Sequence, residues 1–69
     1  MLTDREKEVL YLISFGYSAR EIGEKLFLSH HTIKSHKKRL LYKLDVRNSA
    51  GLIRKAFELG HLSFEGLVA

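Results

Sequence analysis

The sequence predicts an all-α domain of four helices. Three observations support this fold class: proline is absent, apolar residues recur with a period of about 3.6, and glycine or serine separates the periodic runs. A chain of 69 residues has room for one small core, so we treat residues 1–69 as a single domain. Because cysteine is also absent, apolar packing must hold the fold without disulfides or zinc–thiolate sites.

The first helix is expected over about residues 4–15. Thr3 followed by Glu6 forms a capping box, in which the hydroxyl accepts a hydrogen bond from a free backbone N–H and the carboxylate accepts one from the cap residue. Gly16 can close this helix, because glycine adopts a positive φ without a Cβ clash. The apolar residues that share one face are Leu2, Val9, Leu10 and Ile13.

A second, shorter helix is expected over about residues 19–27, and it begins with another capping box, Ser18 and Glu21. Gly23 lies inside this helix, where glycine weakens helix formation by about 1 kcal/mol relative to alanine. We interpret Gly23 as a packing residue that lets the next helix approach closely. Ile22 and Leu26 point inward.

The third helix is expected over about residues 30–44, with Ser29 as its N-cap. A helical wheel separates an inner face from an outer face that is basic and able to form hydrogen bonds. His36 lies at the edge of the inner face and is interpreted as a packed, hydrogen-bonded structural residue. The inner face carries Ile33, Leu40 and Leu44, the outer face His31, Lys34, Ser35, Lys38 and Tyr42, and a flank Arg39 and Lys43.

The fourth helix is expected over about residues 49–59, capped by Asn48 or Ser49 and ended by Gly60. Its apolar residues cover more of the surface than one narrow stripe can bury, so a weak homodimer through this helix is one interpretation. The alternative is that the tail residues Leu62, Phe64 and Leu67 fold back over it. The apolar residues of the helix are Leu52, Ile53, Ala56, Phe57 and Leu59.

Positive charge is concentrated in one segment of the chain. The net charge is +4, yet Ser29–Arg47 alone carries +5, with Asp45 as its single acidic residue. A short helix, a tight turn and a longer basic helix form a helix-turn-helix, whose second helix can enter the major groove of DNA. The sequence therefore predicts binding to double-stranded DNA.

Within this segment, the predicted contacts divide between bases and phosphates. Lys34, Ser35 and Lys38 are the expected base contacts, since lysine can donate to guanine and serine can donate or accept. Ser29 and Thr32 lie at the helix start, where free N–H groups favour anions. The full set expected to contact the DNA backbone is Ser29, His31, Thr32, Lys43 and Arg47.

Several other functional classes lose support. The apolar runs are far shorter than the roughly 20 residues needed to cross a bilayer, so no membrane contact is expected. No nucleophile, acid–base pair and oxyanion donors can be grouped in a cleft, so an enzyme is not expected. His30, His31, His36 and His61 lack the i, i+4 spacing of a helical metal pair, and no metal or cofactor is expected.

The ordered motifs resemble the LuxR-type, or GerE-like, DNA-binding domain of bacterial transcription regulators. The resemblance covers Leu2 to about Leu59 and rests on residues 2–10, 16–18, 21–23, 32–36 and 43–46, together with Leu26 and Ser29. It implies a four-helix helix-turn-helix, with Lys34, Ser35 and Lys38 at base edges and Thr32, Lys43 and Arg47 at the backbone. Gly23 departs from the family, which often has alanine there, and Ser49 stands where many members carry arginine.

The resemblance also implies a cytoplasmic location in the bacterial nucleoid, dimer contacts through the fourth helix and a contact with RNA polymerase. Two alternatives stay open at this point. One is a sigma-factor region-four domain, whose recognition helix usually carries an Arg-Glu-Arg pattern where this chain has residues 31–36. The other is a helical protein-interaction module whose basic face meets an acidic partner.

Overall fold

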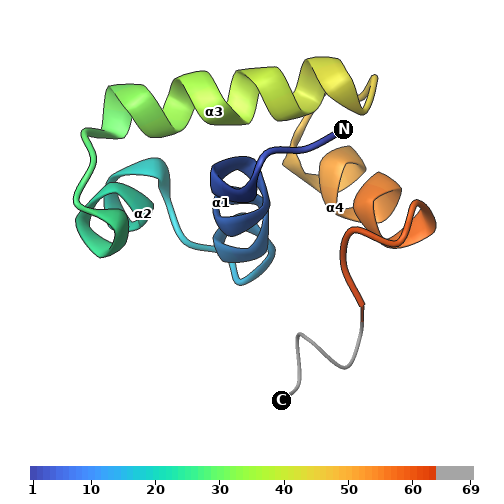
Figure 1. Cartoon of the computed structure of the whole chain (residues 1–69), viewed down its shortest axis with the longest axis horizontal. Coiled ribbons are helices and arrows are strands. Elements are labelled where there is room, and N and C mark those ends of the chain that lie inside the picture. Colours follow the sequence, from blue (N-terminus) through green and yellow to red (C-terminus); the bar gives the residue numbers. More distant parts are fainter. Residues whose placement is uncertain (64–69) are drawn as a thin grey trace.

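The computed structural model describes residues 1–63, and every regular element in this part is a helix. Each predicted helix is present and ends one residue earlier than expected. In the figures α3 lies across one side of the other three helices, so that its opposite side faces away from them (Figure 1). The helices are α1 (Asp4–Ser14), α2 (Ala19–Leu26), α3 (His30–Lys43) and α4 (Ser49–Glu58).

Side chains immediately before the helices satisfy the free N–H groups of their first turns. Both predicted capping boxes are confirmed. Glu6 N donates to Thr3 Oγ1 at 3.1 Å while Thr3 N donates to Glu6 Oε1 at 2.8 Å, and Ser18 and Glu21 repeat this pattern with the same distances. Asn48 rather than Ser49 caps α4, because its Oδ1 accepts from the backbone N–H of Gly51 at 2.9 Å.

Two helices end as the glycines predict, with φ of +88° at Gly16 and +82° at Gly60. The end of α2 is different. Phe27 takes the left-handed conformation there, with φ 58° and ψ 42°. A side chain with a Cβ is strained in this region, and Phe27 is 94% exposed, so packing does not compensate for the strain.

Gly23 is packed against the turn that follows α2, as interpreted from the sequence. Gly23 O accepts a hydrogen bond from Leu28 N at 2.8 Å. A methyl group on Gly23 would lie 2.5 Å from the Leu28 carbonyl oxygen and 3.4 Å from His30 N. The turn therefore closes directly onto the backbone of α2, and only glycine fits there without a shift.

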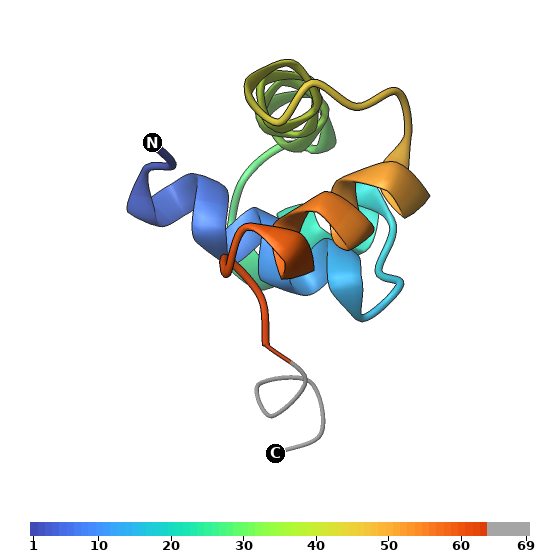
Figure 2. The ribbon, with the colours of Figure 1, turned by 90° about the vertical axis from the view of Figure 1, so that its right-hand side faces the viewer.

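Figure 2 shows α3 end-on, above the other helices. The core is formed where the four helices meet, and α2 and α3 pack most extensively. On α4, Leu52 and Ala56 are fully buried, whereas Leu59 is 53% exposed. Leu62 folds back into the core, as one alternative predicted, while Phe64 and Leu67 lie outside the described residues. The buried apolar residues are Leu2, Val9, Leu10, Ile22, Ile33, Leu40, Leu44, Leu52, Ala56 and Leu62.

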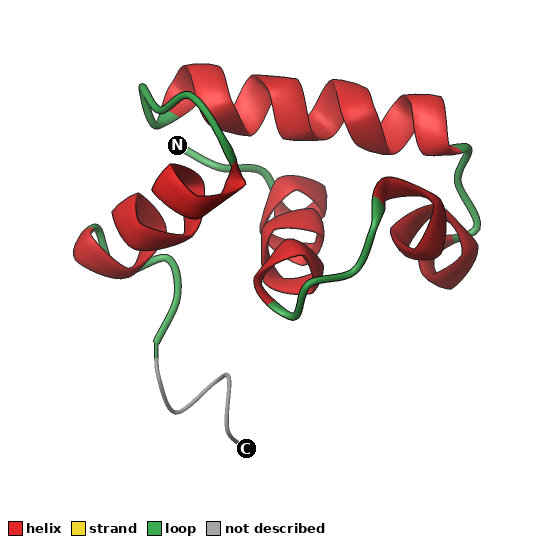
Figure 3. Ribbon diagram, turned by 180° about the vertical axis from the view of Figure 1, so that it is seen from behind, coloured by secondary structure: helices red, strands yellow, loops and turns green. Residues whose placement is uncertain are grey.

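The connection between α2 and α3 is a short turn of residues 27–29, seen from behind in Figure 3. Ser29 ends this turn and caps α3, since its Oγ accepts a hydrogen bond from Thr32 N at 3.2 Å. The same turn that closes onto Gly23 therefore also fixes the residue at which α3 begins. As a result, the outer face of α3 has a fixed position relative to α2.

Candidate nucleic-acid interface

The predicted base contacts lie together on the outer face of α3. Lys34, Ser35 and Lys38 are exposed, whereas Ile33 and Leu40 on the opposite side of the helix are buried. No other helix of the described part covers this outer face (Figure 1). The amphipathic pattern of α3 thus presents one polar, basic surface about two turns long, and an α-helix of this kind fits the major groove.

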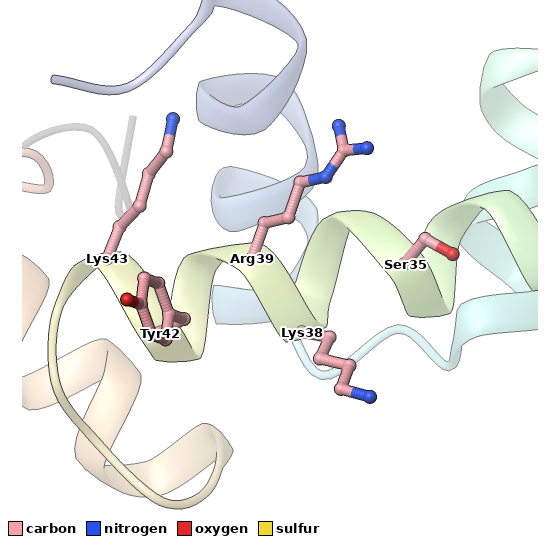
Figure 4. Close-up of a pocket in the computed structure, with 5 residues that line it drawn as sticks. All are labelled: Ser35, Lys38, Arg39, Tyr42 and Lys43. Carbon is pink, nitrogen blue, oxygen red and sulfur yellow. The ribbon is translucent and has the colours of Figure 1, made fainter.

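A shallow hollow of about 440 Å³ lies on the same side of α3. Arg39 and Lys43 extend from one flank and Lys38 from the other, with the Tyr42 ring between them (Figure 4). Tyr42 is 86% exposed, which is unusual for so large a side chain. The hollow is lined by Ser35, Lys38, Arg39, Tyr42 and Lys43.

The sequence predicts that Arg39 and Tyr42 lie near this surface, but neither was predicted as a DNA contact. The signal was present, because the helical wheel puts Tyr42 on the outer face and Arg39 on its flank. A helical wheel gives the direction of each side chain around the helix axis but not how far the side chain extends along the surface. In the structure both line the hollow beside Lys38, so they extend the candidate interface toward the C-terminal end of α3.

The hydroxyl groups at the start of α3 are already engaged with each other. Ser29 Oγ accepts from Thr32 N at 3.2 Å and lies 3.0 Å from Thr32 Oγ1. His31 is exposed, and its ring lies against that of His30, with the two centroids 4.1 Å apart. The predicted backbone contacts of this end therefore form a group at the first turn of α3.

Lys43 has a partner that the sequence did not predict. Its Nζ donates to Glu6 Oε1 at 2.8 Å and to the Met1 carbonyl oxygen at 3.1 Å. The Glu6 side chain is only 3% exposed, whereas that of Lys43 is 35% exposed. Hydrogen bonds from Lys43 and then from the Thr3 backbone lower the pKa of Glu6, outweighing the opposite effect of burial.

The other basic residues of the interface have no carboxylate partner in the part of the chain that the structure describes. Within residues 1–63, no ion pair joins Lys34, Lys38 or Arg39 to an acidic side chain, and Arg47, exposed in the loop after α3, has none either. Their charges are therefore not neutralised by the described part of the protein. An array of unpaired cations on one helix face is the electrostatic footprint of a polyanion site.

His36 differs in part from its interpretation. The residue is half-buried, as expected for a packed histidine. The expected hydrogen bond is not formed at Nδ1, which is buried and has no partner among residues 1–63.

The described part of the chain offers little for other chemistry. Among residues 1–63, no group of three or more histidine or acidic residues is placed to hold a metal ion. In the same part, no helix is long and apolar enough to cross a membrane.

Comparison with known proteins agrees with the geometry. Residues 1–56 match the family described as bacterial regulatory proteins, luxR family. The chain is 39% identical over 64 residues to the oxygen regulatory protein NreC of Staphylococcus haemolyticus, covering 93% of this chain and 30% of that protein. It is 43% identical over 65 residues to the transcriptional regulatory protein MctR of Rhizobium johnstonii, covering 94% and 30% respectively.

The chain thus spans about 30% of the length of the curated relatives it matches. No solved structure matches it. The family match decides against the sigma-factor alternative, and it covers all of α1, α2 and α3 and most of α4. The chain belongs to the LuxR family of bacterial regulatory proteins, whose helix-turn-helix domains bind DNA.

Proposed function

We propose that α3 is the recognition helix and that its outer face enters the major groove, where Lys34, Ser35 and Lys38 contact base edges. The observation that carries this proposal is the exposed, basic outer face of α3, whose Lys34 and Lys38 form no ion pair with residues 1–63, opposite a buried inner face. Lysine can donate to guanine O6 and N7, and a serine hydroxyl can pair with either kind of base. All three residues fall within the first three turns of the helix.

Phosphate contacts are proposed at both ends of this helix. At the first turn of α3, the phosphate contacts are Ser29, His31 and Thr32. In the loop that follows α3, the contact is Arg47. Lys43 can serve as well, because an ammonium has three donors and the bonds to Glu6 and Met1 occupy two. Its contribution to DNA binding should be smaller than that of Arg47, since Glu6 already neutralises much of its charge.

We propose that residues 1–69 act as the DNA-binding domain of a transcription regulator, working in the bacterial cytoplasm at the nucleoid. Both relatives described above are named as regulatory proteins. A contact with RNA polymerase would use surfaces of α1 or α4 that DNA on the outer face of α3 leaves free (Figure 1).

The test is selection of binding sites from random duplex DNA, followed by titration of the selected duplex and a scrambled one at several salt concentrations. The selected site should bind at least about 10³-fold more tightly than the scrambled duplex, and affinity for both should fall as salt rises. Failure to enrich any sequence would contradict the proposal, whatever the affinity for DNA in general.

A weak two-fold dimer through α4 is a second proposal. Leu59, the C-cap of α4, is 53% exposed, and Ile53 and Phe57 are half-buried, so some apolar surface of α4 is left uncovered by residues 1–63. Leu52 cannot contribute, because it is fully buried in the core. Two copies on one face of DNA would address half-sites about 34 Å apart, and shared DNA would raise their effective concentration.

Titration of a palindrome and of a single half-site tests this dimer, with Leu59→Gln compared against Tyr17→Gln, which changes an exposed side chain between α1 and α2. Cooperative binding to the palindrome should be reduced by Leu59→Gln and kept by Tyr17→Gln. Equal affinity for each half-site in the wild type and both variants would show that α4 only packs in the core and forms no dimer contact.

A further inference from the structure

The first two residues of α3 form a stacked pair of imidazole rings. The centroids of His30 and His31 are 4.1 Å apart, and their planes are inclined by 34°. His30 is half-buried and His31 is exposed. Two groups that both gain positive charge on protonation are therefore held side by side at the edge of the candidate interface.

Helix α2 adds a permanent cation to this pair. Gly23 packs against the start of α3, because a methyl group added to Gly23 would lie only 3.4 Å from His30 N. Arg20 lies three residues before Gly23 and so shares this side of α2. On α3 itself, Lys34 lies one turn after His30. Arg20 from α2 and His31 and Lys34 from α3 are therefore the positively charged or titratable groups that act on His30.

The electrostatics of His30 show that these groups act on it in the free protein. Partial desolvation of the ring lowers its pKa from 6.5, and the charges of His31, Arg20 and Lys34 lower it further. No carboxylate of residues 1–63 is among the groups that act on it. A protonated His30 is therefore repelled by Arg20 and Lys34, and an anion that docks beside it would relieve this repulsion.

We propose that Arg20 and His30, together with His31, bind a phosphate of the DNA backbone beside the base-contacting Lys34, and that His30 takes up a proton when the phosphate docks. The proposal rests on the placement of α3 in the major groove, which brings the start of α3 and the adjoining edge of α2 against the DNA. Arg20 supplies a charge that does not titrate, whereas His30 adds one only when it is protonated.

The sign of the pH dependence follows from this linkage. In the free protein His30 is mostly neutral at pH 7.5, because its pKa lies below the ordinary value. A phosphate beside it favours the imidazolium and raises the pKa in the complex. Protons are therefore taken up on binding, and affinity rises as pH falls, by at most about tenfold per pH unit for one proton.

The experiment titrates the selected duplex at constant salt from pH 7.5 to 5.5, using the wild type, His30→Gln and His61→Gln. His61 is the matched control, since it is exposed after α4 and outside the cluster. The wild type and His61→Gln should bind about 3- to 10-fold more tightly at pH 5.5 than at pH 7.5. His30→Gln should lose most of this gain. Circular dichroism at each pH checks that every protein is folded.

Two further measurements separate phosphate binding from a general effect of charge. The NMR titration of the His30 ring should show a higher pKa with DNA than without. Arg20→Gln should weaken binding to selected and scrambled duplexes alike and reduce the salt slope by about 1. It should also raise the pKa of His30 in the free protein, because a repelling charge is removed.

The possible failures are distinguishable. If the wild type prefers no duplex at any pH, the proposed placement of α3 fails, and the proton-linked site fails with it. If preference persists but His30→Gln keeps the full pH dependence, or DNA leaves the pKa of His30 unchanged, only the proton-linked site is overturned.

Discussion

Lys43 and Glu6 join the last turn of α3 to the first turn of α1 through a hydrogen-bonded ion pair of 2.8 Å. The same carboxylate oxygen also accepts the capping hydrogen bond from Thr3 N. One buried oxygen therefore fixes both the start of α1 and the position of α3 against it. Removing Lys43 leaves a buried carboxylate without its cation. Removing Glu6 leaves a partly buried ammonium without its acceptor.

Glu6→Gln should destabilise the domain by about 1–3 kcal/mol, because a neutral amide removes the negative charge that strengthens the buried hydrogen bond from Lys43. Lys43→Met should cost more, since it leaves the carboxylate of Glu6, whose side chain is only 3% exposed, without its cation. Urea denaturation of the two single variants and the double variant measures the coupling. Additive losses would show that the pair does not link α1 to α3 energetically.

Acid should remove the contribution of Glu6. Its pKa is lowered below 4.5 in the folded protein, so the stabilisation is complete above that ordinary value and is lost as pH falls through the lowered one. The stability difference between wild type and Glu6→Gln should therefore be constant from pH 7 to 5 and narrow below about pH 4.5. A difference that stays constant at low pH would contradict this linkage.

Gly23→Ala should destabilise the domain by about 1–3 kcal/mol, although alanine favours a helix, because the added methyl group meets the Leu28 carbonyl at 2.5 Å. Gly51→Ala is the matched control, since the same methyl group there meets its nearest atoms at an ordinary 3.5 Å. That variant should be neutral or more stable. Thermal unfolding compares the two, and equal effects would argue against the close approach at Gly23.

Phe27→Gly should stabilise the domain by about 1 kcal/mol, because glycine removes the strain of a left-handed residue without losing buried contacts. Tyr42→Gly provides the opposite case, an exposed aromatic inside α3, and should cost about 1 kcal/mol. Chemical denaturation of both variants tests the contrast. Destabilisation by Phe27→Gly would mean that the Phe27 side chain contributes packing in the folded state.

Local signals in the sequence predicted most of the fold. The capping boxes at Thr3 and Ser18 and the glycines at 16 and 60 are recognisable because their hydrogen bonds and backbone angles depend on residues a few positions apart. Phe27 was not predictable, since nothing in its residue type favours a positive φ. There the close contact of Gly23 with Leu28 determines the turn.

The candidate site was predictable as a face but not as a set of partners. Periodicity places Lys34 and Lys38 outward because it depends only on the helical repeat. The pairing of Lys43 with Glu6 joins residues 37 positions apart, and the approach of Arg20 to His30 depends on how two helices cross. Such contacts follow from tertiary packing, which a helical wheel does not describe.

Base preferences of single variants test most directly whether the outer face of α3 reads base pairs. Binding of Lys34→Ala, Lys38→Ala and Arg47→Ala should be measured on the selected site and on duplexes with each base pair changed in turn. Lys34→Ala and Lys38→Ala should each lose about 1–3 kcal/mol on the selected site and relax preference at one or two positions. Arg47→Ala should weaken binding to all duplexes alike and reduce the salt slope by about 1. A uniform loss for the two lysine variants, with every base preference intact, would contradict base reading by α3.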